Sequence, residues 1–329
     1  MKKNIILNIL LFSLLYSACS NAHESVIQRV LGINATAPVF INCKATSPTE
    51  VEFHFSTPVK VNSIYFEPEI AFEDISEGEV VTVNLKQQLL GGELITADIL
   101  VEDSHRNTLN VLVPFRTRND RMPTLIINEI RTEYSKPKVE FVEFRPQTSG
   151  NLGALRLFIA SNGIDTPVFE FPPVEVRAGE YIVIHLRSIE EGLVNETGTN
   201  LGASKGTEAF SYARDFWIPD AKKLLRKTDA VFFMDQDDNV LSAIVLSENP
   251  DTWGTRQEIP KAVEMLVRKG AWSGTSLRDA FPSKGTTVTR SISRDEKLSN
   301  NKRASDWYIT ATSGASPGSP NNPKRYEAK

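Results

Sequence analysis

The chain has 329 residues, of which 40% are hydrophobic, so it holds enough apolar material for two domains of ordinary size. Its 37 basic and 41 acidic side chains give a net charge of −4, which lacks the basic excess typical of nucleic-acid-binding proteins. We therefore expect no nucleic-acid partner. The 4 histidines stand singly in the sequence, without metal-site spacing, and no cofactor is predicted.

The first 18 residues have the features of an export signal. Lys2 and Lys3 provide a positive start, and a mostly apolar run follows from residue 5 to residue 15. The run is shorter than the ~20 residues that a membrane-spanning helix needs. Small residues, Ser17 and Ala18, precede Cys19 as they do at a cleavage site.

This arrangement resembles the signal of bacterial lipoproteins, with the relaxed cleavage motif of spirochaetes. The resemblance implies that residues 1–18 are removed and that Cys19 is acylated, which makes a lipid bilayer a partner. The expected location is the bacterial cell envelope, at the outer membrane or facing the periplasm. An ordinary secretory signal that is cut elsewhere is the alternative.

Residues 19–34 are predicted to form a tether between the lipid and the first domain. A flexible segment of 15 residues spans roughly 20 Å. An acylated Cys19 leaves Cys43 without a disulfide partner in the chain. Cys43 lies in an apolar, strand-like run, and we expect it to pack as a small apolar residue rather than to act as a reactive thiol.

Residues 35–117 alternate in the manner of short strands separated by turns. The segment from Val51 to Phe55 places Val51, Phe53 and Phe55 on one face. Strands of this length and spacing favour a β-sandwich. Residues 38–59, with Ser47-Pro48 and Thr57-Pro58 at their turns, resemble bacterial immunoglobulin-like domains of the S-layer type.

A charged linker at residues 118–124 is predicted to lead into a second domain at residues 125–322, followed by a tail at 323–329. Several separated pieces of this region resemble the lamin-tail domain family. They are Ile127-Asn128-Glu129-Ile130, Glu140-Phe141-Val142-Glu143-Phe144, Leu152 to Leu157, Ala178 to Ile184, Ser291 to Arg294, Trp307 and Ser316 to Asn321. The chain departs from that family at Arg145 and Leu155, where asparagine and tryptophan are usual.

The resemblance implies a compact immunoglobulin-like sandwich with an insertion at about residues 187–228. The predicted fold class is therefore all-β, with two immunoglobulin-like β-sandwich domains, the second carrying a helical and loop insertion. One helix is expected between Thr255 and Ala271, with a capping box of Thr255 and Glu258 or a later start near Pro260. Its apolar positions have helical spacing: Ile259, Ala262, Val263, Leu266 and Val267.

A basic stretch at residues 220–227 is a second possible helix. Its three lysines and one arginine suit either a solvated face or contact with anionic lipid, at ~1 kcal/mol per charge near a membrane.

Two groups of acidic residues have the chemistry of functional sites. Asp235, Asp237 and Asn239 alternate like calcium ligands, but short polar side chains between two strands are equally typical of a hairpin turn. We accordingly predict no metal. The other group, Glu129, Glu140 and Glu143, offers carboxylates for acid–base work. Glu140 and Glu143 point to opposite strand faces, so one of them faces inward. That residue would need a partner such as Arg156, and an internal ion pair is therefore the structural alternative.

Tyr212, Phe216 and Trp217 cluster in the insertion. If exposed, they form a binding surface for a protein or a glycan, and if buried, they seal the insertion against the sandwich.

The expected function is non-enzymatic: binding, adhesion or scaffolding in the envelope, with a protein or glycan ligand in the envelope or host. The alternative is a secreted hydrolase, of nuclease or phosphoesterase type, or its accessory subunit. The lamin-tail resemblance implies this alternative, because bacterial domains of that family often accompany such enzymes.

Overall fold

The computed structural model describes residues 36–219 and 222–328, which are built mainly of β-strands, so the all-β prediction is confirmed. Their contacts define two units. The first contains the described residues up to Leu89 together with Leu94–Thr117, and the second contains Leu90–Glu93 and the described residues from Arg118 onward. The predicted leader, Cys19 and the tether lie outside the described residues. No helix among the described residues is long and apolar enough to cross a bilayer.

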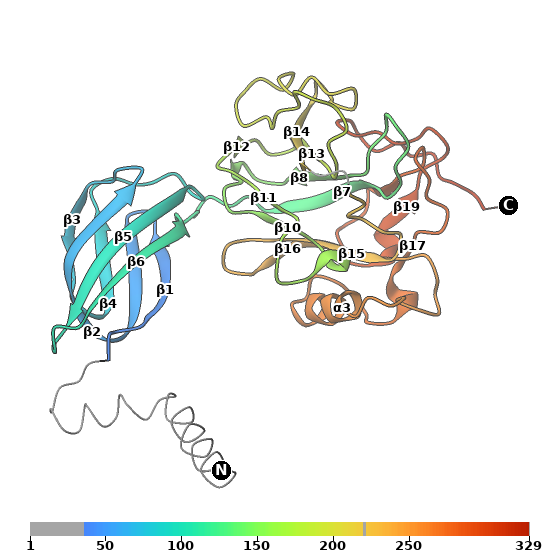
Figure 1. Cartoon of the computed structure of the whole chain (residues 1–329). Helices are drawn as coiled ribbons and strands as arrows, with labels where there is room; N and C mark the ends of the chain where they lie inside the picture. Colours follow the sequence, from blue (N-terminus) through green and yellow to red (C-terminus); the bar gives the residue numbers. More distant parts are fainter. Residues whose placement is uncertain (1–35, 220–221, 329) are drawn as a thin grey trace, which may run out of the picture. The chain divides into compact units, whose positions relative to one another are not determined.

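The first unit is a six-stranded sheet, folded so that one face encloses a core (Figure 1). The sheet order is β3-β4-β2-β5-β6, and β1 also pairs with β2. The strands are β1 (Phe40–Ser47), β2 (Glu50–Glu67), β3 (Phe72–Ile75), β4 (Gly78–Leu85), β5 (Leu94–Asp103) and β6 (Thr108–Arg116).

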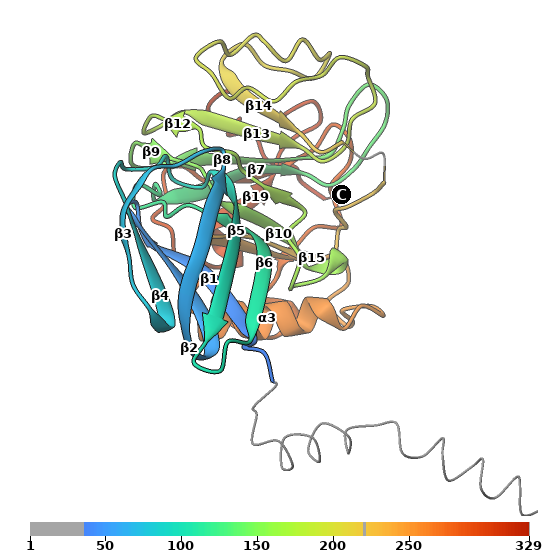
Figure 2. The same ribbon diagram turned by 60° about the vertical axis from the view of Figure 1, so that its left-hand side comes forward.

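The long strand β2 connects the two layers of this unit. Its first part pairs with β1 and β4, and its second part, from Val59 to Glu67, pairs with β5. The register shifts between His54 and Val59, where a bulge lets a strand bend. Figure 2 gives a second view of these strands.

Alternation along β2 builds the core as predicted. Val51, Phe53 and Phe55 are buried, and the Phe53 ring meets Phe115 edge-on with centroids 6.4 Å apart. Cys43 is half-buried against this core. Burial raises the pKa of its thiol to about 12, so the thiol stays protonated near neutral pH.

The second unit packs two sheets face to face. The six-stranded sheet has the order β14-β13-β8-β7-β18-β19, and the five-stranded sheet has the order β11-β10-β15-β16-β17. The six-stranded sheet contains β7 (Leu125–Arg131), β8 (Phe141–Pro146), β13 (Tyr181–His185), β14 (Ala213–Trp217), β18 (Ile292–Arg294) and β19 (Trp307–Ile309). The five-stranded sheet contains β10 (Arg156–Ile159), β11 (Phe169–Glu170), β15 (Asp229–Met234), β16 (Val240–Ser247) and β17 (Phe281–Pro282).

Short elements complete the second unit. β9 (Gly150–Asn151) pairs with β12 (Glu175–Val176). The 3₁₀ turns are η1 (Ala160–Asn162), η2 (Leu277–Asp279) and η3 (Ala304–Asp306).

The helix α3 (Glu258–Arg268) covers the face of the five-stranded sheet that points away from the six-stranded sheet (Figure 1). Because both faces of β15 are covered, all six of its residues are buried. The predicted apolar stripe is confirmed at Ile259, Ala262, Val263 and Leu266. The predicted capping box is wrong: Gln257 is the N-cap, without a side-chain cap bond. Pro260 stands in the first turn, where its missing N–H costs little.

The insertion and the linker are more ordered than predicted. β14 of the insertion joins the six-stranded sheet, in parallel with β13. Residues 222–227 form a loop rather than a helix, and the buried Leu225 ties this loop to the core. In the predicted linker, Asn119 is buried and donates to the carbonyl oxygens of Asn151 and Gly153.

Replacing Phe53 with alanine should destabilise the first unit by about 3–5 kcal/mol, because it leaves a cavity in the core. The exposed Tyr65, 69% of whose surface is accessible, provides the control, and Tyr65→Ala should change stability by less than about 0.5 kcal/mol. Urea unfolding followed by circular dichroism measures both. Equal losses in the two variants would contradict this assignment of the core.

Candidate functional site

The six-stranded sheet has one apolar face and one polar face, and both are covered. Its inner face carries Ile130, Val142 and Phe144, which pack in the main core. Glu129 and Glu143 are register partners on β7 and β8, and they accept hydrogen bonds from segments that cover the other face. The register shift between Ile127 and Glu129 is a bulge at this point. Two carboxylates therefore lie side by side in the interior.

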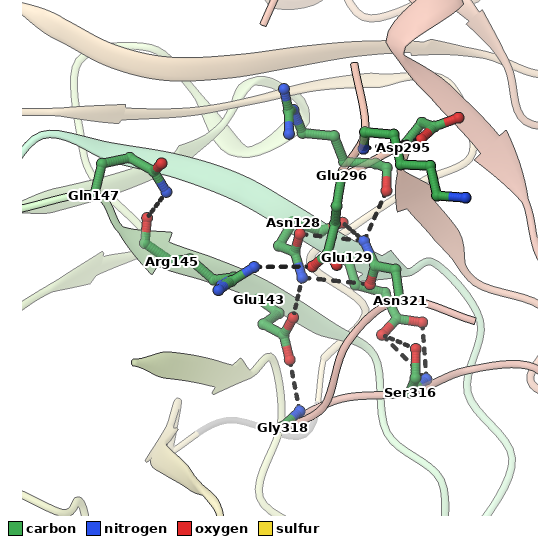
Figure 3. Close-up of polar contacts among 12 residues, drawn as sticks. Asn128, Glu129, Glu143, Arg145, Gln147, Asp295, Glu296, Ser316, Gly318 and Asn321 are labelled. Carbon is green, nitrogen blue, oxygen red and sulfur yellow. Dashed lines mark hydrogen bonds and ion pairs between the residues drawn. The ribbon is translucent and has the colours of Figure 1, made fainter. Parts of the chain in front are cut away.

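The C-terminal segment closes over these carboxylates (Figure 3). Glu143 accepts from the backbone N–H of Gly318 at 2.6 Å and from the side-chain amide of Asn128 at 2.7 Å. Glu129 accepts from the Ser291 hydroxyl and, at 3.0 and 3.1 Å, from the backbone N–H of Ser316. Residues 316–318 are thereby fastened to strands that lie more than 170 residues earlier in the sequence.

Asn321 completes the closure. Its side-chain amide donates to the carbonyl oxygen of Asn128 on β7 at 3.1 Å and to that of Arg294 on β18 at 2.8 Å (Figure 3). One side chain thus joins the C-terminal segment to two neighbouring strands. We name the group of Asn128, Glu129, Glu143, Ser291, Ser316, Gly318 and Asn321 the closure cluster.

Burial governs the electrostatics of the closure cluster. Removal from water raises the pKa of Glu129, although hydrogen bonds from Ser291 and Ser316 oppose the shift. Burial raises the pKa of Glu143 well above its usual range, and the neighbouring charge of Glu129 raises it further. Both carboxylates are 0% exposed. Their acceptor atoms are used inside the fold, so the arrangement stabilises the domain and does not present an acid–base pair to a substrate.

The third glutamate of the predicted group, Glu140, has a different partner from the one expected. Arg187 holds it through two nitrogen–oxygen contacts of 2.6 and 2.5 Å, and both side chains are buried. The Arg187 guanidinium also lies 4.1 Å from the ring centroid of Tyr134. Arg156 instead pairs with Asp238 at 2.7 Å, in the turn between β15 and β16. An internal ion pair exists, but Arg156 was the wrong partner.

The acidic turn at residues 235–239 forms a hairpin connection. One Asp235 carboxylate oxygen accepts from the backbone N–H groups of Asp237 and Asn239 at 2.8 and 2.9 Å. Asp237 pairs with Arg118 at 2.6 Å. Short polar side chains stabilise turns in this way. Within residues 36–219 and 222–328, no group of three or more His, Cys, Asp or Glu side chains is placed to hold a metal ion.

The three aromatic residues of the insertion do not form one surface. Phe216 lies in the main core, and Trp217 is buried with its ring stacked 3.8 Å from His185. The Trp217 indole N–H donates to the Ser204 hydroxyl at 2.5 Å. Tyr212 alone is exposed, over 81% of its surface. Phe216 and Trp217 therefore seal the insertion onto the sheet, because their large apolar rings gain more from burial there.

Two Gly-x-Ser-x-Gly stretches, at residues 202–206 and 314–318, carry the spacing of a hydrolase nucleophile turn. That spacing signals chemistry only on a turn from strand to helix. Neither stretch leads into a helix. Ser204 is buried beneath Trp217, and Ser316 belongs to the closure cluster. Both serines support the packing of loops.

The second unit carries two open clefts among its described residues. The first, here called the basic cleft, has a volume of about 540 Å³ and includes Lys223, Arg226, Lys227, Trp253 and Arg256 in its lining. The second, the insertion cleft, has a volume of about 640 Å³ and includes Arg177, Glu180, Thr199, Leu201 and Arg214. Both volumes fall within the range of small-molecule sites, ~300–1,000 Å³.

The stability of the second unit should fall as the pH rises above 4.5, the usual pKa of glutamate. Because the pKa of Glu143 is raised in the folded state, the folded protein keeps a proton that the unfolded chain releases. The stabilisation from this proton is complete below pH 4.5 and is lost as the pH rises through the raised pKa. The variant Glu143→Gln cannot ionise at this position, so its free energy of unfolding should fall less steeply with pH.

Urea unfolding between about pH 4 and pH 8 tests this, with tryptophan fluorescence as the readout. All 4 tryptophans lie in the second unit, so the signal reports on that unit. The exposed Glu175 supplies the control Glu175→Gln, which should keep the wild-type slope. An unchanged slope in Glu143→Gln would contradict the assignment.

Arg187→Met should destabilise the second unit by about 3–5 kcal/mol, because it leaves the Glu140 carboxylate buried without its partner. The double variant Glu140→Gln with Arg187→Met should recover much of the loss, since no uncompensated charge remains. Thermal unfolding of the three proteins measures the difference. Additive losses in the double variant would show that the pair is not coupled.

Comparison with known proteins places the second unit in a family. Residues 123–309, more than half of the chain, match the family TP_1001_2nd, described as "protein second domain". An uncharacterized protein of the spirochaete Treponema pallidum (strain Nichols) is 26% identical over 211 residues, which cover 60% of this chain and 53% of the relative. The chain thus matches about half the length of that relative. No solved structure matches the chain significantly.

The matched residues begin just before β7 and end with β19, so they span both packed sheets and α3 of the second unit. The chain belongs to the TP_1001_2nd family.

Proposed function

We propose that this chain is an exported, lipid-anchored protein of the bacterial cell envelope that acts as a non-enzymatic binding or scaffolding protein. The main observation behind this proposal is that the candidate catalytic carboxylates are buried and bonded within the fold. Glu129, Glu140 and Glu143, the residues suited to acid–base catalysis, are enclosed in internal contacts. The same unit carries two open clefts of ligand size.

The insertion, where a hydrolase would need its site, uses its acidic groups in the same internal way. Glu196 accepts from the backbone N–H groups of Ser204 and Asp215 at 3.0 and 2.9 Å. Asp215 pairs with His185 at 2.7 Å, and both of these side chains are buried. These contacts favour a rigid loop support over a reacting centre. A phosphodiesterase and nuclease screen with added Ca²⁺ or Mg²⁺ tests the hydrolase alternative.

The lamin-tail resemblance of residues 125–322 is part of the proposal. The arrangement of its motifs in space supports it. Residues from four of its separated motifs, on β7, on β8, beside β18 and at residues 316–321, meet in the closure cluster. We likewise propose that the first unit is a bacterial immunoglobulin-like domain, which would act as a spacer between the anchor and the binding unit.

The anchor makes a direct prediction. Cys19→Ala should shift the protein from the membrane fraction to the soluble fraction, because the thiol that carries the lipid is gone. Cell fractionation with immunoblotting measures this, and Cys43→Ala is the matched control that should stay with the membrane. If Cys19→Ala stays there too, the anchor proposal fails.

Binding is tested separately, with purified chain against envelope components and host-matrix proteins and glycans. Specific capture of one component supports the proposal. A clean negative across both groups, with both units shown to be folded, counts against it.

A further inference from the structure

The basic cleft has two walls that come from distant parts of the sequence. The loop before β15 supplies Lys223, Arg226 and Lys227, and the segment leading into α3 supplies Trp253 and Arg256. Leu225 is fully buried between the cationic residues of the first wall and fixes that loop on the core. The charged side chains therefore project from an anchored backbone.

Asp229 connects the two walls. Its carboxylate accepts from the backbone N–H of Arg226 at 3.2 Å, on the first wall. It also accepts from the Ser161 backbone N–H at 2.9 Å and from the Ser161 hydroxyl at 2.6 Å. The carbonyl oxygen of Ser161 in turn accepts from the Arg256 guanidinium at 2.8 Å, on the second wall. A single buried carboxylate thus sets the spacing of Arg226 and Arg256.

The lining of the basic cleft is positive although the whole chain is negative. Four cationic side chains, Lys223, Arg226, Lys227 and Arg256, face two acidic ones, Glu133 and Glu248, which leaves two net positive charges. The chain as a whole carries −4. A local excess of this sign concentrates anions at the cleft.

The acidic residues neutralise this excess only loosely. Lys227 and Glu248 are 3.7 Å apart, and Lys223 and Glu133 are 3.3 Å apart at an exposed position. Ion pairs of this kind contribute little, so an anion can compete for the lysines. Within the described residues, the Arg226 guanidinium has no ion-pair partner.

We propose that the basic cleft binds a phosphate-bearing ligand. Arginine guanidinium groups bind phosphate through paired, charge-assisted hydrogen bonds, and the lysines add point charges. Trp253 and Ile259 give the cleft an apolar side that suits the organic part of such a ligand. The phosphate belongs either to a lipid headgroup or to a soluble phosphate compound. The binding chemistry does not depend on the lipid anchor, so the two proposals can fail independently.

The test titrates pyrophosphate into the purified full chain by calorimetry in mild detergent. Arg226→Ala and Arg256→Ala should each weaken binding about tenfold or more, because each removes a charge-assisted contact. Lys261→Ala is the matched control: it removes an exposed cation from α3 outside the cleft and should leave affinity unchanged. Glu248→Gln should shift affinity the other way, tightening binding several-fold.

A second arm separates the two sources of phosphate. Micelles doped with phosphatidylglycerol are compared with soluble glycerol phosphate at equal phosphate concentration. Stronger binding to the doped micelles identifies a lipid headgroup, and equal binding identifies a soluble ligand; either result supports the proposal if it depends on Arg226 and Arg256. Absence of binding to all three probes at millimolar concentration overturns it. Binding that Lys261→Ala weakens as much as Arg226→Ala also overturns it, since this shows attraction to general surface charge. Thermal unfolding confirms that every variant is folded.

Discussion

The second unit depends on the hydrogen bonds that two buried carboxylates accept from the C-terminal segment. The strands β7 and β8 carry Glu129 and Glu143, which water would otherwise solvate. Burying a carboxylate is costly unless donors replace the water. Here the donors are the backbone N–H groups of Ser316 and Gly318, the Ser291 hydroxyl and the amide of Asn128. The polar face of the sheet is therefore an interior surface, and the last part of the chain has to reach it before the sheet is complete.

Periodicity predicted those parts of the fold in which one face meets a core. The alternation of Val51, Phe53 and Phe55 and the helical stripe from Ile259 to Leu266 both appear in the structure. Periodicity separates inward from outward positions, but it does not say whether the outward face is exposed to solvent or covered by another segment. Glu140 and Glu143 were predicted to point to opposite faces of the strand, yet both are buried, Glu140 against Arg187 and Glu143 under Gly318. The same limit left open whether Trp217 is exposed or buried, because its burial depends on contacts with Ser204 and His185.

For the same reason, pairings between residues distant in the sequence could not be predicted. One of Glu140 and Glu143 was expected to need a cationic partner such as Arg156. Glu140 has such a partner, but the choice of Arg187 over Arg156 depends on the path of the insertion past β13. The cluster at Glu129 also depends on a bulge, since a one-residue change of register exchanges the two faces of a strand. The sequence can indicate that a buried carboxylate needs a cationic partner, but which residue becomes that partner depends on the topology of the fold.

The closure cluster holds the second unit together, whereas the cleft proposed to bind a ligand is formed by the segments that lead into β15 and α3. Asp229 has the same role at the basic cleft that Glu129 and Glu143 have in the closure cluster, because it holds two distant segments through donors from each. Burial raises its pKa to about 6. At neutral pH it is ionised and accepts from Ser161, Arg226 and Ala230. Below pH 6 a proton occupies part of that acceptor capacity, which loosens the tie between Arg226 and Ser161. The spacing of the two arginines across the basic cleft is therefore set by an ionised aspartate.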